Sequence, residues 1–146
     1  MAAGSVVFYQ HAIEDALRGL LDLQSMTLVV SLVSQGYTPN AKSHSVYSAD
    51  ASANVITSSG YADRTLAGTT VARTSGSYVT WDGNDLTLSA AATMRAKYAI
   101  VYRQTGGQRL VCYFDLETTQ TTGVEVTQLV IQWNALGIVQ FNNPSA

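Results

Sequence analysis

The spacing of apolar residues changes once along the chain, near residue 26. Over residues 6–24 apolar side chains recur at intervals of three and four, which predicts an amphipathic α-helix. Ser5 is the candidate N-cap, and a shorter helix over about 9–22, led by an extended arm, is the alternative. The stripe must be covered by the chain's own sheet or by a neighbour. It consists of Ala12, Ile13, Ala16, Leu17, Leu20 and Leu21.

Three further residues bear on this helix. Glu14 and Arg18 are four apart in the favourable order, so we expect an ion pair on the outer face. Gly19 is expected to weaken the middle of the helix by about 1 kcal/mol relative to Ala.

From Thr27 onward the pattern changes to period two and to short apolar runs bounded by turn residues. The polar stretch 40–54 predicts either a short helical turn around 46–49 or a surface loop. Residues 105–108, with two glycines that tolerate positive φ, predict a hairpin loop. The predicted strands are 27–34, 69–75 and 77–83 (separated at Gly76), 85–90, 94–104, 109–117, 124–133 and 137–141.

One helix followed by roughly eight short strands predicts a mainly β chain, an antiparallel β-sandwich or barrel with one N-terminal α-helix. The strands lie too close together in sequence for crossover helices, which argues against a parallel sheet. At 146 residues we expect a single domain. Its parts are an N-terminal arm and helix (1–25), a β-domain (26–141) and a polar tail (142–146).

The strand 109–117 is apolar on both sides. Strict alternation places Leu110, Cys112 and Phe114 on one side, and Val111, Tyr113 and Asp115 on the other. Strands that are apolar on both sides occur where both faces of a sheet are covered. We therefore expect the N-terminal helix to supply the second cover.

The composition is poor in charge. Charged residues make up 12% of the chain, about half the usual share, and Thr, Ser, Gln, Asn and Ala take their place. Such a surface is easier to dehydrate, and interface cores are also depleted in charge. Composition alone leaves two possibilities equally open, a protein that assembles with others and an ordinary Thr-rich β-protein.

Charge and hydropathy exclude several partners. The net charge is −2 and the basic residues are scattered, so we expect no nucleic-acid partner. The N-terminus lacks the pattern of a signal peptide, and no apolar run approaches the ~18 residues of a membrane span. Cys112 is the single cysteine, cannot form an internal disulfide, and favours synthesis in a reducing cytoplasm.

Candidate catalytic chemistry is weak. His11 and Asp15 are expected to form a solvent-exposed pair on the helix. His44 lies near Ser43, Ser45 and Asp50, but a triad is defined by geometry, and no G-x-S-x-G motif is present. Cys112, inside a predicted strand, is expected to be a small buried hydrophobe. We expect no catalytic, cofactor-binding or metal-binding residues and no enzymatic activity.

The segment 81–86 offers the oxygen donors Asp82, Asn84 and Asp85. Their spacing does not fit a calcium loop of the EF-hand type, and no distal glutamate follows. We therefore interpret this segment as a turn.

The aromatic residues gather in or beside the strongest strands. Tyr98 and Tyr102, with Ile100 between them, share one strand face, and we expect core packing with the hydroxyls at the rim. The alternative is a contact surface for a neighbouring subunit or for sugar. In a carbohydrate-binding module, the stacking platforms would include Tyr37, Tyr61 or Trp81.

Several segments, in order, resemble a family of small virion proteins of tailed bacteriophages. They are "LLDLQSMTLVVSLV", "YTPNA", "SGYA", "VTWDGNDLTLSA", "MRAKYAIVYRQTG", "LVCYFDLE" and "LVIQWNALGIVQF". Members of the family usually carry a helix, a leucine-rich strand leading to a Tyr-Thr-Pro turn, a "RYAVLY"-like strand and an "IQW-N/D-x-x-G-I" ending. The most specific matches are "YTP", "KYAIVY" and "IQWNALGI". The start "MAAGSVVFYQHAIEDA" and the tail "NNPSA" depart from the family pattern.

The resemblance implies a virion structural protein and carries no active-site residues. We expect a capsid decoration (cement) protein on the capsid exterior, made in the host cytoplasm. It would bind the major capsid protein and associate with itself as a homotrimer. The alternatives are a tail, neck or fibre component, or a carbohydrate-binding β-module. The helix stripe and the segment "AAGSVVFY" are the candidate contact regions.

Overall fold

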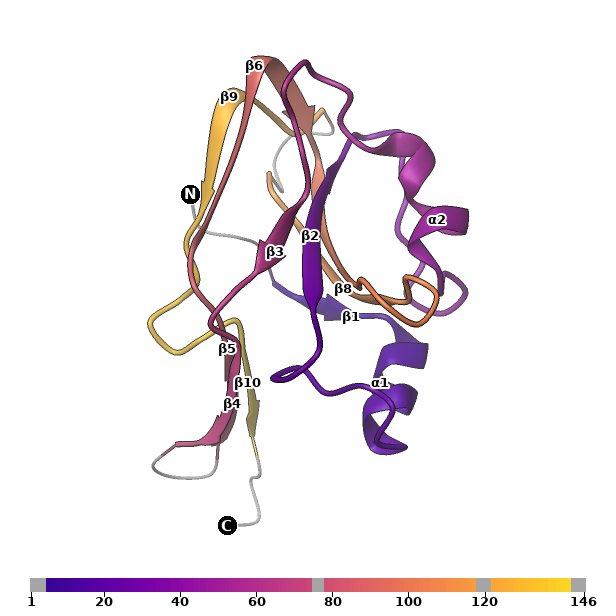
Figure 1. The fold of residues 1–146 in the computed structure, drawn as a ribbon, viewed down its shortest axis with the longest axis vertical. Coiled ribbons are helices and arrows are strands. Elements are labelled where there is room, and N and C mark those ends of the chain that lie inside the picture. The colour runs from indigo at the N-terminus through magenta and orange to yellow at the C-terminus, as the bar shows by residue number, and fades with distance from the viewer. Residues whose placement is uncertain (1–4, 75–77, 118–121, 143–146) are drawn as a thin grey trace.

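The computed structural model describes residues 5–74, 78–117 and 122–142 (Figure 1). Two short helices and one 3-10 turn accompany the strands in this part of the chain. The elements are β1 (Val7–Phe8), α1 (Gln10–Leu17), β2 (Leu28–Val33), α2 (Tyr47–Asp50), the 3-10 turn (Ser52–Asn54), β3 (Arg64–Leu66), β4 (Thr70–Arg73), β5 (Tyr78–Asp82), β6 (Leu86–Ala96), β7 (Tyr98–Arg103), β8 (Leu110–Asp115), β9 (Val124–Ile131) and β10 (Val139–Asn142).

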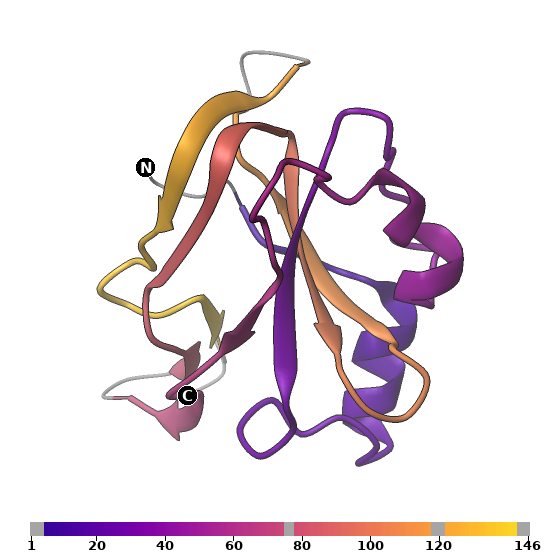
Figure 2. The same ribbon diagram turned by 45° about the horizontal axis from the view of Figure 1, so that its top comes forward.

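The strands form three antiparallel sheets in a sandwich-like arrangement. The largest has the order β1-β8-β7-β2-β3, and the others are β10-β5-β4 and β6-β9. In Figures 1 and 2 the two smaller sheets lie on one side of the five-stranded sheet and the helices lie on the other. The mainly β prediction with an N-terminal helix is confirmed. Sequence reasoning missed the short strands β1 and β3.

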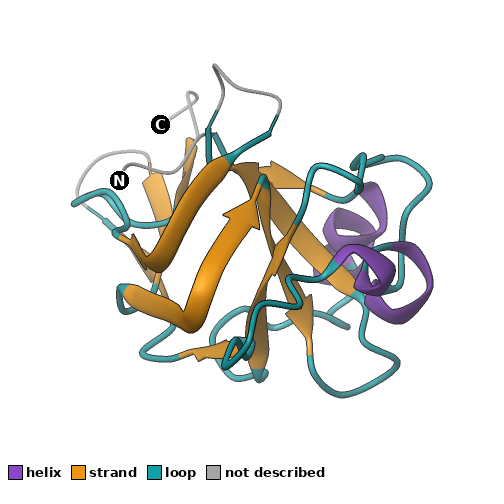
Figure 3. Ribbon diagram, turned by 90° about the horizontal axis from the view of Figure 1, so that it is seen from above, coloured by secondary structure: helices purple, strands orange, loops and turns teal. Residues whose placement is uncertain are grey.

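The five-stranded sheet separates two hydrophobic cores. All six residues of β2 are buried, with Leu28, Val30 and Leu32 in the larger core and Val29 and Val33 in the smaller one. The larger core, which includes Trp81 and Phe114, is closed by the two smaller sheets, and the smaller core is closed by the helices (Figure 3). The expectation that the N-terminal helix covers the second sheet face is confirmed.

Helix α1 is shorter than the favoured prediction and matches the alternative of an extended arm followed by a helix. The β-branched start pairs with β8 as a strand, so Tyr9 and not Ser5 is the N-cap, without a side-chain capping bond. Gly19, at φ +73°, ends the helix. Its N–H donates to Ala16 O (3.1 Å) and the Leu20 N–H donates to Asp15 O (2.7 Å), the Schellman arrangement. Gly19 is therefore a stop signal and not a weak point.

The predicted apolar stripe of α1 is only partly buried. Ala12 and Asp15 face the sheet, whereas Ile13 is 49% and Leu17 is 85% exposed. The cause is Arg109, the residue directly before β8, which donates two hydrogen bonds to the Asp15 carboxylate, at 2.7 and 3.3 Å. This pair turns the charged side of the helix toward the sheet. The predicted Glu14–Arg18 ion pair is present at 2.8 Å.

Two predictions about strands are wrong because the observed strands contain shifts in pairing register. Residues 85–90 and 94–96 belong to one strand, β6, whose register against β9 shifts between Ser89 and Met94. In β8 a register shift opposite Val101 and Tyr102 breaks the alternation. As a result Val111, Cys112 and Phe114 share the larger core while Leu110 faces the smaller one.

The remaining predicted strands lie within two residues of the observed bounds, and the helical turn considered around 46–49 is α2. The predicted hairpin at 105–108 joins β7 and β8, with Gly106 at φ +72° and Gly107 at φ +87°. The predicted break at Gly76 lies outside the described residues.

Candidate functional site

The three-stranded sheet has one largely apolar face, which also carries Arg73 opposite Val79, and one polar face, because residues alternate along β4, β5 and β10. Val71 pairs with Trp81, and Val79 pairs with Phe141, so these four side chains share one face. Trp81 is fully buried, while Val71, Val79 and Phe141 are exposed. The apolar face thus begins in the core and continues into solvent.

Phe8 of β1 connects this face to the body of the protein. Its ring centroid lies 6.0 Å from that of Trp81 and 5.8 Å from that of Phe141. Both are tilted contacts of the kind that stabilise aromatic pairs. Phe141 is therefore held in position although 48% of it is exposed.

A hollow of about 520 Å³ lies between the end of α1 and β4, lined by Ala16, Leu21, Leu23 and Val71. Gln24, which also lines the hollow, is tied to β4, because its side-chain Oε1 accepts a hydrogen bond from the Val71 N–H at 3.0 Å. Ile13 and Leu17 of α1, and Leu20 shortly after the helix, are also exposed. We call the combined exposed set the apolar surface: Ile13, Leu17, Leu20, Val71, Val79 and Phe141.

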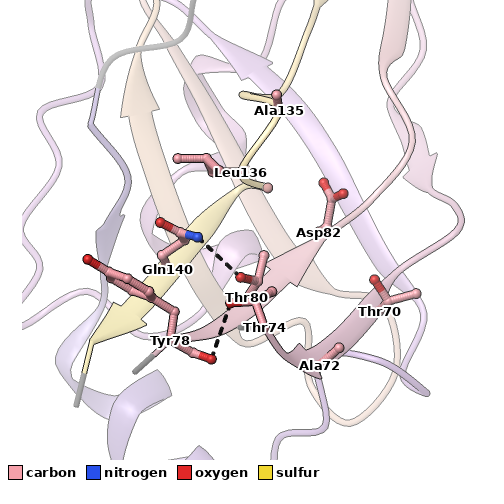
Figure 4. Close-up of a pocket in the computed structure, with 10 residues that line it drawn as sticks. Thr70, Ala72, Thr74, Tyr78, Thr80, Asp82, Ala135, Leu136 and Gln140 are labelled. Atoms are coloured by element: carbon pink, nitrogen blue, oxygen red, sulfur yellow. Dashed lines mark hydrogen bonds between the residues drawn. The ribbon is translucent and has the colours of Figure 1, made fainter. Parts of the chain in front are cut away.

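The opposite face of the same sheet carries a groove of about 510 Å³ (Figure 4). Thr80 lies at its centre, with Tyr78 and Gln140 on one side and Asp82 and Thr70 on the other. The Gln140 Nε2 lies 3.5 Å from Thr80 Oγ1. Sequence reasoning missed this groove, although the alternation in "TVARTSGSYVTWD" is the signal that would have revealed a two-faced sheet.

The end wall of the groove is the turn 134–137, part of the "IQWNALGI" segment. Asn134 Oδ1 accepts from the Leu136 N–H (3.0 Å), Asn134 O accepts from the Gly137 N–H (2.8 Å), and Trp81 O accepts from the Ile138 N–H (2.8 Å). The two bonds to Asn134 close the turn, and the bond from Ile138 fastens it to β5. Leu136 is left projecting and is 59% exposed.

The predicted turn at 81–86 supports this wall. Asp85 Oδ1 accepts from the Trp133 N–H (2.9 Å), and Asn84 O accepts from Trp133 Nε1 (2.9 Å). Asp82 Oδ1 accepts from the N–H of Gly83 at 2.8 Å. The side-chain oxygens of Asp82 and Asp85 thus accept backbone N–H groups, as the turn interpretation predicts. Within 5–74, 78–117 and 122–142 no group of three or more His, Cys, Asp or Glu side chains is placed to hold a metal ion.

The residues suggestive of a triad do not form one among the described side chains. His44 Nδ1 lies 2.9 Å from the Tyr37 hydroxyl, which lies 2.7 Å from the Tyr9 hydroxyl. Asp50 instead accepts hydrogen bonds from the backbone N–H groups of Ser45 (2.7 Å) and Val46 (2.9 Å). Burial opposes ionisation of Asp50, but these backbone donors outweigh it and lower its pKa. The arrangement stabilises the start of α2.

The expected exposed pair of His11 and Asp15 is wrong. Asp15 is 9% exposed and pairs with Arg109. His11 is partly buried, and its Nε2 has no hydrogen-bond partner among the described groups. Burial, and then the charge of Arg109, lower the pKa of His11 below its ordinary value.

Most of the aromatic residues are structural. Tyr37 and Trp81 are buried, so neither can stack on a sugar. The Tyr61 hydroxyl accepts from the Leu32 N–H (2.7 Å) and donates to Asp63 (2.8 Å).

Ile100, Tyr98 and Tyr102 share the smaller core, as predicted. The Tyr102 hydroxyl donates to Asp63 at 3.2 Å, and burial raises the pKa of Tyr102. Cys112 is fully buried, which raises the pKa of its thiol and confirms its predicted place in the core.

No family model, curated protein or solved structure matches the chain. No helix among the described residues has the length and apolar character needed to cross a membrane.

Proposed function

We propose that this chain is a structural protein of a tailed-bacteriophage virion, a decoration protein that binds the head exterior as a homotrimer. It would contact the major capsid protein and would be made in the host cytoplasm. The observation that carries the proposal is the apolar surface, whose sheet residues Val71, Val79 and Phe141 continue from the core at Trp81 and Phe8 into solvent. The low charge and the resemblance of "YTP", "KYAIVY" and "IQWNALGI" to virion proteins support it.

The size of the apolar surface suits weak binding of many copies. Fully burying one exposed Val, Leu, Ile or Phe stabilises by about 1.5–3 kcal/mol. Six side chains that are roughly half exposed would therefore contribute about 6 kcal/mol. Association costs about 4–15 kcal/mol in lost freedom, so one isolated contact would be weak. Copies that also contact one another on a symmetric shell gain affinity through multivalency.

A tail, neck or fibre component could use the same surface. The position of labelled protein on negatively stained particles separates these assignments from the head. Label on the head exterior supports a decoration protein, and label confined to the tail or neck contradicts it.

The proposal is tested by the mass of the purified chain in solution and by its co-sedimentation with heads assembled without it. We expect a trimer that binds such heads. Val79→Lys should reduce head binding at least tenfold, because it places a second positive charge opposite Arg73 in the apolar surface. Val130→Lys is the matched control, since Val130 on β9 is 38% exposed and Val79 is 37% exposed. A monomer that ignores the heads, or equal loss in both variants, contradicts the proposal.

A further inference from the structure

The groove on the polar face of the three-stranded sheet has the features of a ligand site, independently of the apolar surface on the other face. Its volume of about 510 Å³ lies within the range of small-molecule sites. Small residues form its floor, namely Ala72 and Thr80. Tyr78 and Leu136, both exposed, provide apolar contact area at its side and end. We propose that this groove binds a neutral saccharide.

The polar groups of the groove suit a ligand rich in hydroxyls. The Thr70 hydroxyl, the second carboxylate oxygen of Asp82 and the Gln140 side-chain oxygen have no hydrogen-bond partner among the described residues. Together with the hydroxyl of Thr80 they offer both donors and acceptors. A pyranose presents hydroxyls at its edge and C–H groups on its face, which match these groups and the Tyr78 ring respectively.

The charge of the residues that line the groove favours an uncharged ligand. Among the described lining residues Asp82 carries the single formal charge, and no Lys, Arg or His is present. An anionic sugar or a phosphate would meet a carboxylate with no cation to balance it. A neutral saccharide avoids this repulsion.

An extended peptide fits the groove less well. Peptides that bind sheets usually add as a strand at an open edge, where backbone groups are unpaired. The floor of the groove is β5, the central strand, which pairs with β4 on one side and β10 on the other. The floor of the groove therefore offers side chains, and the open edges of the sheet lie at the outer sides of β4 and β10.

The test uses the full chain and a glycan array that contains neutral and sialylated oligosaccharides, followed by titration calorimetry with the neutral oligosaccharide that binds best. Tyr78→Ala should weaken binding about tenfold by removing the ring. Ala72→Tyr should abolish binding by filling the floor without removing a polar group. Phe141→Ala is the control, because Phe141 lies on the opposite face of the same sheet, and it should change the affinity less than about twofold.

Thermal unfolding of each variant shows whether it is folded. If Ala72→Tyr does not fold, Tyr78→Ala alone decides the test. The proposal is overturned by an array without neutral ligands, by a preference for sialylated sugars, or by affinity that both groove variants leave unchanged. Binding of a peptide library at the groove instead of sugar overturns it as well. Tyr78→Ala should bind heads as the wild type does. Failure of the saccharide proposal is therefore distinguishable from failure of the proposed virion role.

Discussion

Gly137→Ala tests how the end wall of the groove is held. Gly137 has φ +94°, beyond the left-handed region that L-residues occasionally adopt. A Cβ at this position would lie 2.5 Å from Thr80 Cγ2 and 2.8 Å from Trp81 O. The Trp81 carbonyl already accepts the Ile138 N–H, so it cannot move away without loss of that bond.

The expected loss of stability in Gly137→Ala is estimated by comparing Gly137 with a second glycine, Gly107. Gly107 has φ +87° but nothing within 4 Å of its hypothetical Cβ. Gly107→Ala should therefore show only the backbone strain of about 1–2 kcal/mol. Gly137→Ala adds the two close contacts and a stretched hydrogen bond worth about 1 kcal/mol. We expect a total loss of about 3–4 kcal/mol for Gly137→Ala.

Urea unfolding of the two variants and the wild type measures this difference. The free energy of unfolding should fall by at least 1.5 kcal/mol more in Gly137→Ala than in Gly107→Ala, with similar dependence on urea. Equal losses in the two variants would refute the reasoning, because backbone strain would then explain both.

Three further predictions concern buried polar groups. Arg109→Ala should cost about 2–4 kcal/mol because it leaves the buried Asp15 carboxylate unpaired, and Arg109→Ala combined with Asp15→Ala should cost less than the sum in a double-mutant cycle. The pKa of His11 is lowered by burial, so the unfolded chain binds more protons than the folded chain below about pH 6.5. Stability should therefore decrease as the pH falls through 6.5, and His11→Asn should reduce that slope in urea titrations at pH 5 and 8. The Cys112 thiol should react with a thiol reagent only at the rate of unfolding, and rapid labelling of the folded protein would contradict its burial.

The β-rich fold could be predicted because period-two runs and turn residues mark most of the strands directly. Residues 27–34 show how well this works, since β2 occupies Leu28–Val33. The helix end was misjudged because Gly19 can act either as a weak interior residue or as a stop. The backbone bonds from Gly19 and Leu20 to the last turn decide between the two. These bonds are a matter of local geometry that composition does not reveal.

The exposed face of α1 and the groove could not be predicted from periodicity. The choice of buried face depends on Arg109, which is 94 residues away from Asp15 in the chain. The ion pair between Arg109 and Asp15 decided which face of the helix is buried, against the preference of the apolar stripe. The spacing of apolar residues in the helix does not reveal this pair. The groove likewise depends on the pairing of β10 with β5, which brings Gln140 beside Thr80. Strand order and long-range charge pairing are properties of the whole fold.

Hydrogen–deuterium exchange of the protein free and bound to heads tests most directly whether the apolar surface is buried against other protein. The account predicts that exchange slows on binding in two regions that hold much of the apolar surface. They are the peptides from the start of α1 through Leu21 and the part of β5 around Val79. Peptides from β9 around Val130 should exchange at unchanged rates. Protection of β9 alone, with unchanged exchange in α1 and β5, would contradict the account.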